Sequence, residues 1–133
     1  MTDSIDPEGF RANVGIVLIR DDRQVFLGGR TGGRGWQFPQ GGVRRDESPE
    51  QALFRELKEE IGLELDHVEI FWARSFKRPK QIEILFRAIT SAEPKTQSAE
   101  VEKAIWYALD ALPSGLPSDQ KLLIERAVEN WRV

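Results

Sequence analysis

The sequence predicts an α/β fold in which a mixed sheet packs against one internal helix and one C-terminal helix. Three observations predict it: segments rich in β-branched residues recur along the chain, a helical segment with strong end signals interrupts them, and a second amphipathic helix follows near the C-terminus. A chain of 133 residues is long enough to bury one hydrophobic core. We therefore expect a single domain over residues 1–133.

The first part of the chain is expected to form strands and loops. Residues 13–20 are rich in β-branched side chains, and residues 24–27 follow a short turn, which together predict a hairpin. A glycine-rich loop at residues 31–35 precedes the short apolar segment 36–38. Residues 39–42, with the sequence PQGG, are expected to break regular structure again.

Both predicted helices have recognisable ends. Ser48 is the expected N-cap of the internal helix, Pro49 suits its first position, and Gln51 completes a capping box with Ser48. Gly62 predicts the end of this helix. Ser118 is the expected N-cap of the C-terminal helix, whose apolar residues at helical spacing are Leu122, Leu123, Ala127 and Trp131.

The second half of the chain is expected to add further strands. Residues 68–71 and 82–89 are typical of strands, and the basic segment 74–80 is expected to separate them as a loop. Residues 91–99 form a polar loop in this interpretation, and residues 104–109 form a further short strand.

Composition excludes several classes of function. The chain has no cysteine, which rules out disulfides, thiol nucleophiles and cysteine-based zinc sites and fits a cytoplasmic protein. Its net charge of −3 does not favour nucleic-acid binding, so recognition of a polyanion would depend on local cations. No apolar stretch approaches the ~20 residues needed to span a bilayer. His67, the single histidine, is expected in a solvated connection, which argues against histidine-led acid–base chemistry.

Glutamates crowd onto the internal helix. At ~100° per residue, Glu56 and Glu60 flank the apolar stripe of the helix, and Glu59 lies just beyond Glu56. Like charges four residues apart cost about a few tenths of a kcal/mol, and partly buried carboxylates need partners. Arg55 can bridge to Glu59 but cannot neutralise the whole group. A bound divalent cation and a solvated acidic face are both open interpretations.

Residues 41–63 read GGVRRDESPEQALFRELKEEIGL. A glycine, a glutamate after five intervening residues and the run REL-x-EE-x-GL match the Nudix box at its defining positions. The chain therefore resembles the Nudix hydrolases, which cleave nucleoside diphosphates linked to another moiety by using Mg²⁺ or Mn²⁺. The resemblance implies a Nudix α/β/α sandwich built on a mixed sheet, with the box helix and a C-terminal helix.

The resemblance also implies roles for individual residues. Within the box, the implied metal ligands are Gly41 through its carbonyl, Glu56, Glu59 and Glu60. Arg55 would orient these carboxylates, and Glu47 would support them from outside the start of the helix. Glu100 lies where the family carries a further loop glutamate that acts as a metal ligand or general base, and Glu102 is a nearby alternative. The expected catalytic residues are Glu56, Glu59, Glu100 and Arg55.

Two flanking motifs, FRANVG and WQFPQGG, resemble the bacterial branch of RNA pyrophosphohydrolases and dinucleoside polyphosphate hydrolases. By this resemblance Arg11 and Arg30 would contact the 5′ phosphates or the first nucleotide. Trp36 and Gln40 would help to bind the substrate, although a tryptophan in a short strand is also typical of a core. Ala12 departs from the proline that is usual in this branch.

The function implied is a Mg²⁺-dependent pyrophosphohydrolase, with Mn²⁺ as a possible substitute, that acts on RNA 5′-triphosphate ends or dinucleoside polyphosphates. Residues 74–80 replace a longer insertion of that branch, so the nearest rival is a hydrolase that removes unwanted small nucleotides. Two further alternatives are a non-catalytic Nudix module and a recombined or engineered scaffold with weak activity. We expect a cytoplasmic monomer or homodimer with no membrane partner.

Overall fold

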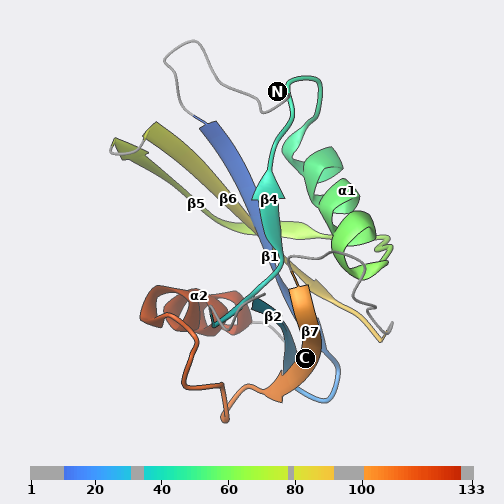
Figure 1. Cartoon of the computed structure of the whole chain (residues 1–133), viewed down its shortest axis with the longest axis vertical. Helices are drawn as coiled ribbons and strands as arrows, with labels where there is room; N and C mark the ends of the chain where they lie inside the picture. The colour runs from blue at the N-terminus through green and yellow to red at the C-terminus, as the bar shows by residue number, and fades with distance from the viewer. Residues whose placement is uncertain (1–10, 31–34, 78–79, 92–100, 130–133) are drawn as a thin grey trace.

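The computed structural model describes residues 11–30, 35–77, 80–91 and 101–129, with the backbone alone for residue 30 and residues 101–104. Within these ranges, one mixed sheet of seven strands lies between two helices (Figure 1). The elements in chain order are β1 (Arg11–Arg20), β2 (Gln24–Arg30), β3 (Trp36–Gln37), β4 (Gln40–Gly42), α1 (Pro49–Ile61), β5 (Glu69–Lys77), β6 (Lys80–Ile89), β7 (Val101–Ala108) and α2 (Ser118–Val128).

The sheet is organised around β1. The strand order is β3-β2-β1-β6-β5, with β4 also paired to β1 and β7 also paired to β2. β1 and β6 are parallel, and the other strand pairs are antiparallel. Because β1 pairs with both β4 and β6, residues from three separate parts of the sequence meet along this strand.

Two apolar cores lie on opposite faces of the sheet. Alternate residues of a strand point to opposite faces, so Val14 and Ile16 of β1 pack on the α1 side while Val17 and Ile19 pack on the α2 side. The buried residues that the helices contribute are Ala52, Leu53, Leu57 and Ile61 from α1 and Leu123, Ile124 and Ala127 from α2. This arrangement confirms the predicted α/β fold class.

The predicted ends of α1 are confirmed. Ser48 Oγ accepts a hydrogen bond from the Gln51 backbone N–H at 3.1 Å, and Gln51 Oε1 accepts one from the Ser48 N–H at 2.9 Å. Pro49 occupies the first turn. Gly62 ends the helix with φ of 61° and donates its N–H to the carbonyls of the last turn, in a backbone conformation that favours glycine.

The predicted start of the C-terminal helix is wrong by one residue. Pro117 is the N-cap of α2, Ser118 is already helical, and no side chain caps this end. The proline φ of −57° suits this position, and the Pro117 carbonyl accepts the first helical hydrogen bond from the Lys121 N–H. Leu122 is 54% exposed rather than part of the packing stripe. Trp131 lies outside the described residues.

Several strands extend beyond their predicted bounds. Residues 74–77 continue β5 rather than forming a loop, because each pairs with a residue of β6 and Arg74 forms an ion pair with Glu83 across the two strands. The PQGG segment does not break the sheet as predicted, since Gln40–Gly42 forms the short strand β4 against β1. β2 continues to Arg30, and β7 begins at Val101.

His67 is exposed in the connection between α1 and β5, as predicted. Neither helix of the described residues is long and apolar enough to cross a membrane.

Candidate active site

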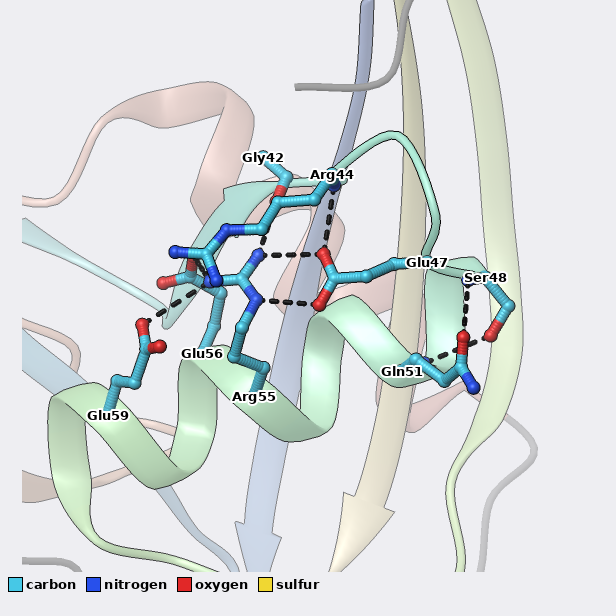
Figure 2. Close-up of polar contacts among 8 residues, drawn as sticks. All are labelled: Gly42, Arg44, Glu47, Ser48, Gln51, Arg55, Glu56 and Glu59. Carbon is cyan, nitrogen blue, oxygen red and sulfur yellow. Dashed lines mark hydrogen bonds and ion pairs between the residues drawn. The ribbon is translucent and has the colours of Figure 1, made fainter. Parts of the chain in front are cut away.

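Arg55, in the middle of α1, is the centre of a hydrogen-bonded cluster (Figure 2). Its Nε donates to Glu47 Oε2 at 2.7 Å, and its Nη2 donates to Glu47 Oε1 at 3.0 Å and to the Gly42 carbonyl at 2.9 Å. Its Nη1 donates to Glu56 Oε1 at 2.7 Å and to Glu59 Oε2 at 3.3 Å. One planar guanidinium therefore ties α1 to β4 and to the loop before the helix.

The cluster is partly buried and carries an excess of negative charge. Arg55, Glu56 and Glu47 side chains are 16%, 16% and 17% exposed, whereas Glu59 is 52% exposed. Hydrogen bonding to Glu47 raises the pKa of Arg55, and hydrogen bonding to Arg55 lowers the pKa of Glu47 below its ordinary value of 4.5. One guanidinium faces three carboxylates, so the cluster favours a further cation.

The lowered pKa of Glu47 predicts a pH-dependent contribution to stability. Because the carboxylate is held by Arg55 in the native state, the ion pair stabilises the fold fully above pH 4.5 and loses this effect as pH falls through the lowered pKa. We expect Glu47→Gln to reduce the free energy of unfolding by roughly 1–2 kcal/mol at neutral pH. Urea titrations at neutral pH and at about pH 3 should show this difference shrinking. A difference that stays constant would contradict the assignment.

Gly41 is required by the position of the Glu56 side chain. A Cβ atom built at Gly41 would lie 2.3 Å from Glu56 Cδ and 2.6 Å from its Oε1, closer than atoms can approach. The glutamate therefore rests directly against the backbone of β4. This packing explains why the motif has a glycine here, independently of any metal.

The oxygen atoms brought together here are of the type that hard divalent cations bind. Glu56 and the backbone of Gly41 are in direct contact, and Glu59 is one turn away on the same side of Arg55. Carboxylate and carbonyl oxygens are the ligands that Mg²⁺ prefers, with remaining positions left to water or phosphate. Among the described residues, no group of three or more aspartates, glutamates or histidines is placed to hold a metal ion. The carboxylate and carbonyl oxygens present here are of the type that Mg²⁺ binds. The described residues supply only part of the coordination shell of such an ion.

A cavity of about 280 Å³ lies beside this cluster, along β1 and next to the end of α1. Its polar lining residues are Asn13, Gln37, Gln40, Glu60, Gln81 and Glu83. Gln40 Nε2 donates to Gln37 Oε1 at 2.7 Å, which fixes the two amides relative to each other. Between them, the Phe38 N–H donates to Gln120 Oε1 of α2 at 3.1 Å. The segment that carries both amides is thus held by the C-terminal helix.

The remaining predicted site residues do not line this cavity or lie outside the described residues. Trp36 packs edge-on against Tyr107 at a ring distance of 5.2 Å on the α2 side of the sheet, and it does not line the cavity. Arg11 is exposed at the start of β1. Arg30 belongs to β2, but its side chain lies outside the described residues, as do Glu100 and the side chain of Glu102.

Sequence reasoning missed four polar residues of the cavity, namely Asn13, Gln37, Gln81 and Glu83. Gln81 and Glu83 are two apart on β6 and so share one face of the strand, while Asn13 is the register partner of Glu83 on the parallel strand β1. Polar residues at alternate positions of an otherwise apolar strand were the available signal. Their meeting with Asn13 depends on a pairing between distant segments.

Comparisons with known proteins identify the family of this chain. A family model for the NUDIX domain matches residues 9–127. An RNA pyrophosphohydrolase of Xanthomonas campestris pv. campestris is 59% identical over 110 residues, covering 79% of this chain and 49% of the relative. An RNA pyrophosphohydrolase of Xylella fastidiosa is 43% identical over 113 residues, covering 81% of this chain and 55% of the relative.

Solved structures share the fold. The crystal structure of a MutT NUDIX hydrolase from Burkholderia pseudomallei is 26% identical to this chain, with a TM-score of 0.76, and the match covers 87% of this chain and 96% of that one. The chain spans about half the length of the curated relatives it matches. Because the family model covers most of the chain and includes the whole Arg55 cluster, the protein belongs to the NUDIX family.

Proposed function

We propose that this protein is a Mg²⁺-dependent pyrophosphohydrolase that cleaves a phosphoanhydride bond of a nucleotide polyphosphate. The substrates proposed are the 5′-triphosphate end of RNA and dinucleoside polyphosphates. Relatives named RNA pyrophosphohydrolase, at 59% and 43% identity, support this class of reaction. The observation that carries the proposal is the position of the Arg55–Glu56 cluster next to a cavity lined by amides.

The residues of the cluster suit this chemistry. A bound Mg²⁺ would offset the negative charge of the phosphates and lower the pKa of a water molecule. Arg55 holds the Glu56 carboxylate through a hydrogen bond of 2.7 Å and makes a longer one to Glu59, so both carboxylates lie on the same side of Arg55 before a substrate binds. A carboxylate accepts the proton of the attacking water, and we propose Glu56, Glu59 or Glu100 for this role, with Glu102 as the alternative. Glu60 faces the same cavity and completes the proposed ligand set.

A small-nucleotide hydrolase is the second candidate function. The cavity of about 280 Å³ is near the lower limit of ligand pockets, roughly 300 Å³, and so fits one nucleotide moiety. The structural match to a MutT NUDIX hydrolase is also consistent with this candidate. In both cases we propose a cytoplasmic enzyme that accepts Mn²⁺ in place of Mg²⁺.

A substrate panel tests the proposal. The purified protein with Mg²⁺ would be given triphosphorylated RNA, a dinucleoside polyphosphate and a free nucleoside triphosphate, and released orthophosphate and pyrophosphate would be measured separately. We expect faster turnover of one of the first two substrates than of the free nucleotide. Rapid hydrolysis of the free nucleotide alone would favour the second candidate. Tight binding without release of either product would favour a non-catalytic module.

A further inference from the structure

The cavity has two chemically different sides, separated by β1. Gly41 of β4 is the register partner of Val14, and it lies with Glu60 on the side of the Arg55 cluster. Glu83 of β6 is the register partner of Asn13, on the other side of β1. A nucleotide that fills this cavity with its phosphates at Gly41 would place its remaining part against β6.

The β6 side disfavours phosphate. Glu83 is negatively charged, and among the described residues no arginine or lysine lines the cavity. The nearby Arg74 is engaged by Glu83 itself, with its Nε donating to Glu83 Oε1 at 2.7 Å. The groups left on this side are a carboxylate and the amides of Asn13 and Gln81. They suit a neutral ligand that carries hydrogen-bond donors, as a nucleobase does.

The Glu83 carboxylate is preorganised for such a ligand. Its side chain is only 17% exposed, and the ion pair with Arg74 fixes its orientation between β5 and β6. Among the described residues, only its Oε1 takes part in a hydrogen bond, so Oε2 retains its capacity to accept. A fixed, partly buried acceptor discriminates strongly, because a ligand that presents a lone pair to it leaves both groups unsatisfied.

We infer that Glu83 selects a guanine base in the substrate of this enzyme, an inference that rests on the proposed nucleotide hydrolysis. Guanine presents two adjacent donors, N1–H and the N2 amino group, on its Watson–Crick edge, and a carboxylate accepts from both. Adenine presents one donor beside the N1 lone pair, which the carboxylate repels. Asn13 lies beside Glu83 on β1, and Gln81 lies two residues before Glu83 on β6, so both amides can supply donors for the guanine carbonyl. A paired contact of this kind discriminates between bases by about 10-fold to 100-fold.

Binding measurements test the inference separately from turnover. Titration calorimetry with Mg²⁺ would compare GDP, IDP and ADP, because IDP lacks only the N2 amino group of GDP. We expect the wild-type protein to bind GDP about 10-fold to 100-fold more tightly than ADP, with IDP between them. Glu83→Gln should bring GDP and ADP to within about three-fold.

Glu69→Gln is the matched control. Glu69 pairs with Arg87 across the same two strands, through a hydrogen bond of 2.6 Å, but it lies outside this cavity. This variant should keep the full preference for GDP. Equal binding of GDP and ADP by the wild-type protein, or a preference that survives Glu83→Gln, would overturn the inference. Guanine-selective binding without hydrolysis of any polyphosphate would instead refute the proposed function and leave the base selection by Glu83 supported.

Discussion

Glu56→Gln is expected to lower turnover by about 10²-fold or more while the fold is retained. Glutamine has the shape of glutamate, so the packing against Gly41 survives and the hydrogen bond from Arg55 can still form. What is lost is one negative charge at the site where we propose that the metal ion binds. Glu59→Gln, which changes a residue that is 52% exposed, should have a similar effect on turnover with even less effect on stability.

The measurement is steady-state hydrolysis across a range of Mg²⁺ concentrations, together with thermal unfolding of each variant. Glu50→Gln is the control, because Glu50 is an exposed glutamate of the first turn of the same helix. It should keep near-normal turnover. Rates close to wild type in both Glu56→Gln and Glu59→Gln would remove these residues from the proposed metal site.

Arg55→Ala is expected to have the largest effect on stability, a loss of about 2 to 4 kcal/mol of unfolding free energy. The substitution leaves the carboxylates of Glu47 and Glu56 partly buried without their cation, and it also removes the donor to the Gly42 carbonyl. Removing one partner of a buried ion pair is costly because the remaining charge stays desolvated. The magnitude is below that of a fully buried pair since both side chains keep some exposure.

Urea unfolding at neutral pH would measure this loss. Lys58→Ala is the matched control on the same helix, because the Lys58 side chain is 73% exposed and its ion pair with Glu64 is long, at 3.8 Å. Its effect should stay within about 0.5 kcal/mol. A comparable loss in both variants would mean that the loss of any positive charge from this acidic helix, and not the buried cluster, explains the result for Arg55.

Features of the fold that depend on local sequence could be predicted well. The start of α1 follows from Ser48 and Gln51, which satisfy each other within one turn, and its end follows from Gly62. The contact between Arg55 and Glu59 follows from helical spacing alone. The start of α2 was misplaced because proline and serine both suit a helix start, and the sequence does not show which of Pro117 and Ser118 adopts the cap conformation.

Features that depend on strand pairing could not be predicted from the sequence. The extension of β5 into a basic segment depends on pairs such as Arg74 with Glu83, which place unlike charges opposite each other. The cavity depends on the register between Asn13 and Glu83, which are 70 positions apart in the sequence. The sequence around either residue alone therefore does not indicate the cavity. The roles of Glu56, Glu59 and Glu100 remain predictions that the described residues do not test.

The hydrogen bond from the Phe38 N–H to Gln120 has a consequence for the order of synthesis on the ribosome. Chains emerge N-terminus first, so the segment from β3 to β4 that carries Gln37 and Gln40 appears long before the residue that anchors it. Until Gln120 has left the exit tunnel and α2 has docked, the segment that carries Gln37 and Gln40 lacks this hydrogen bond. Nucleotide binding should therefore begin only once α2 has docked.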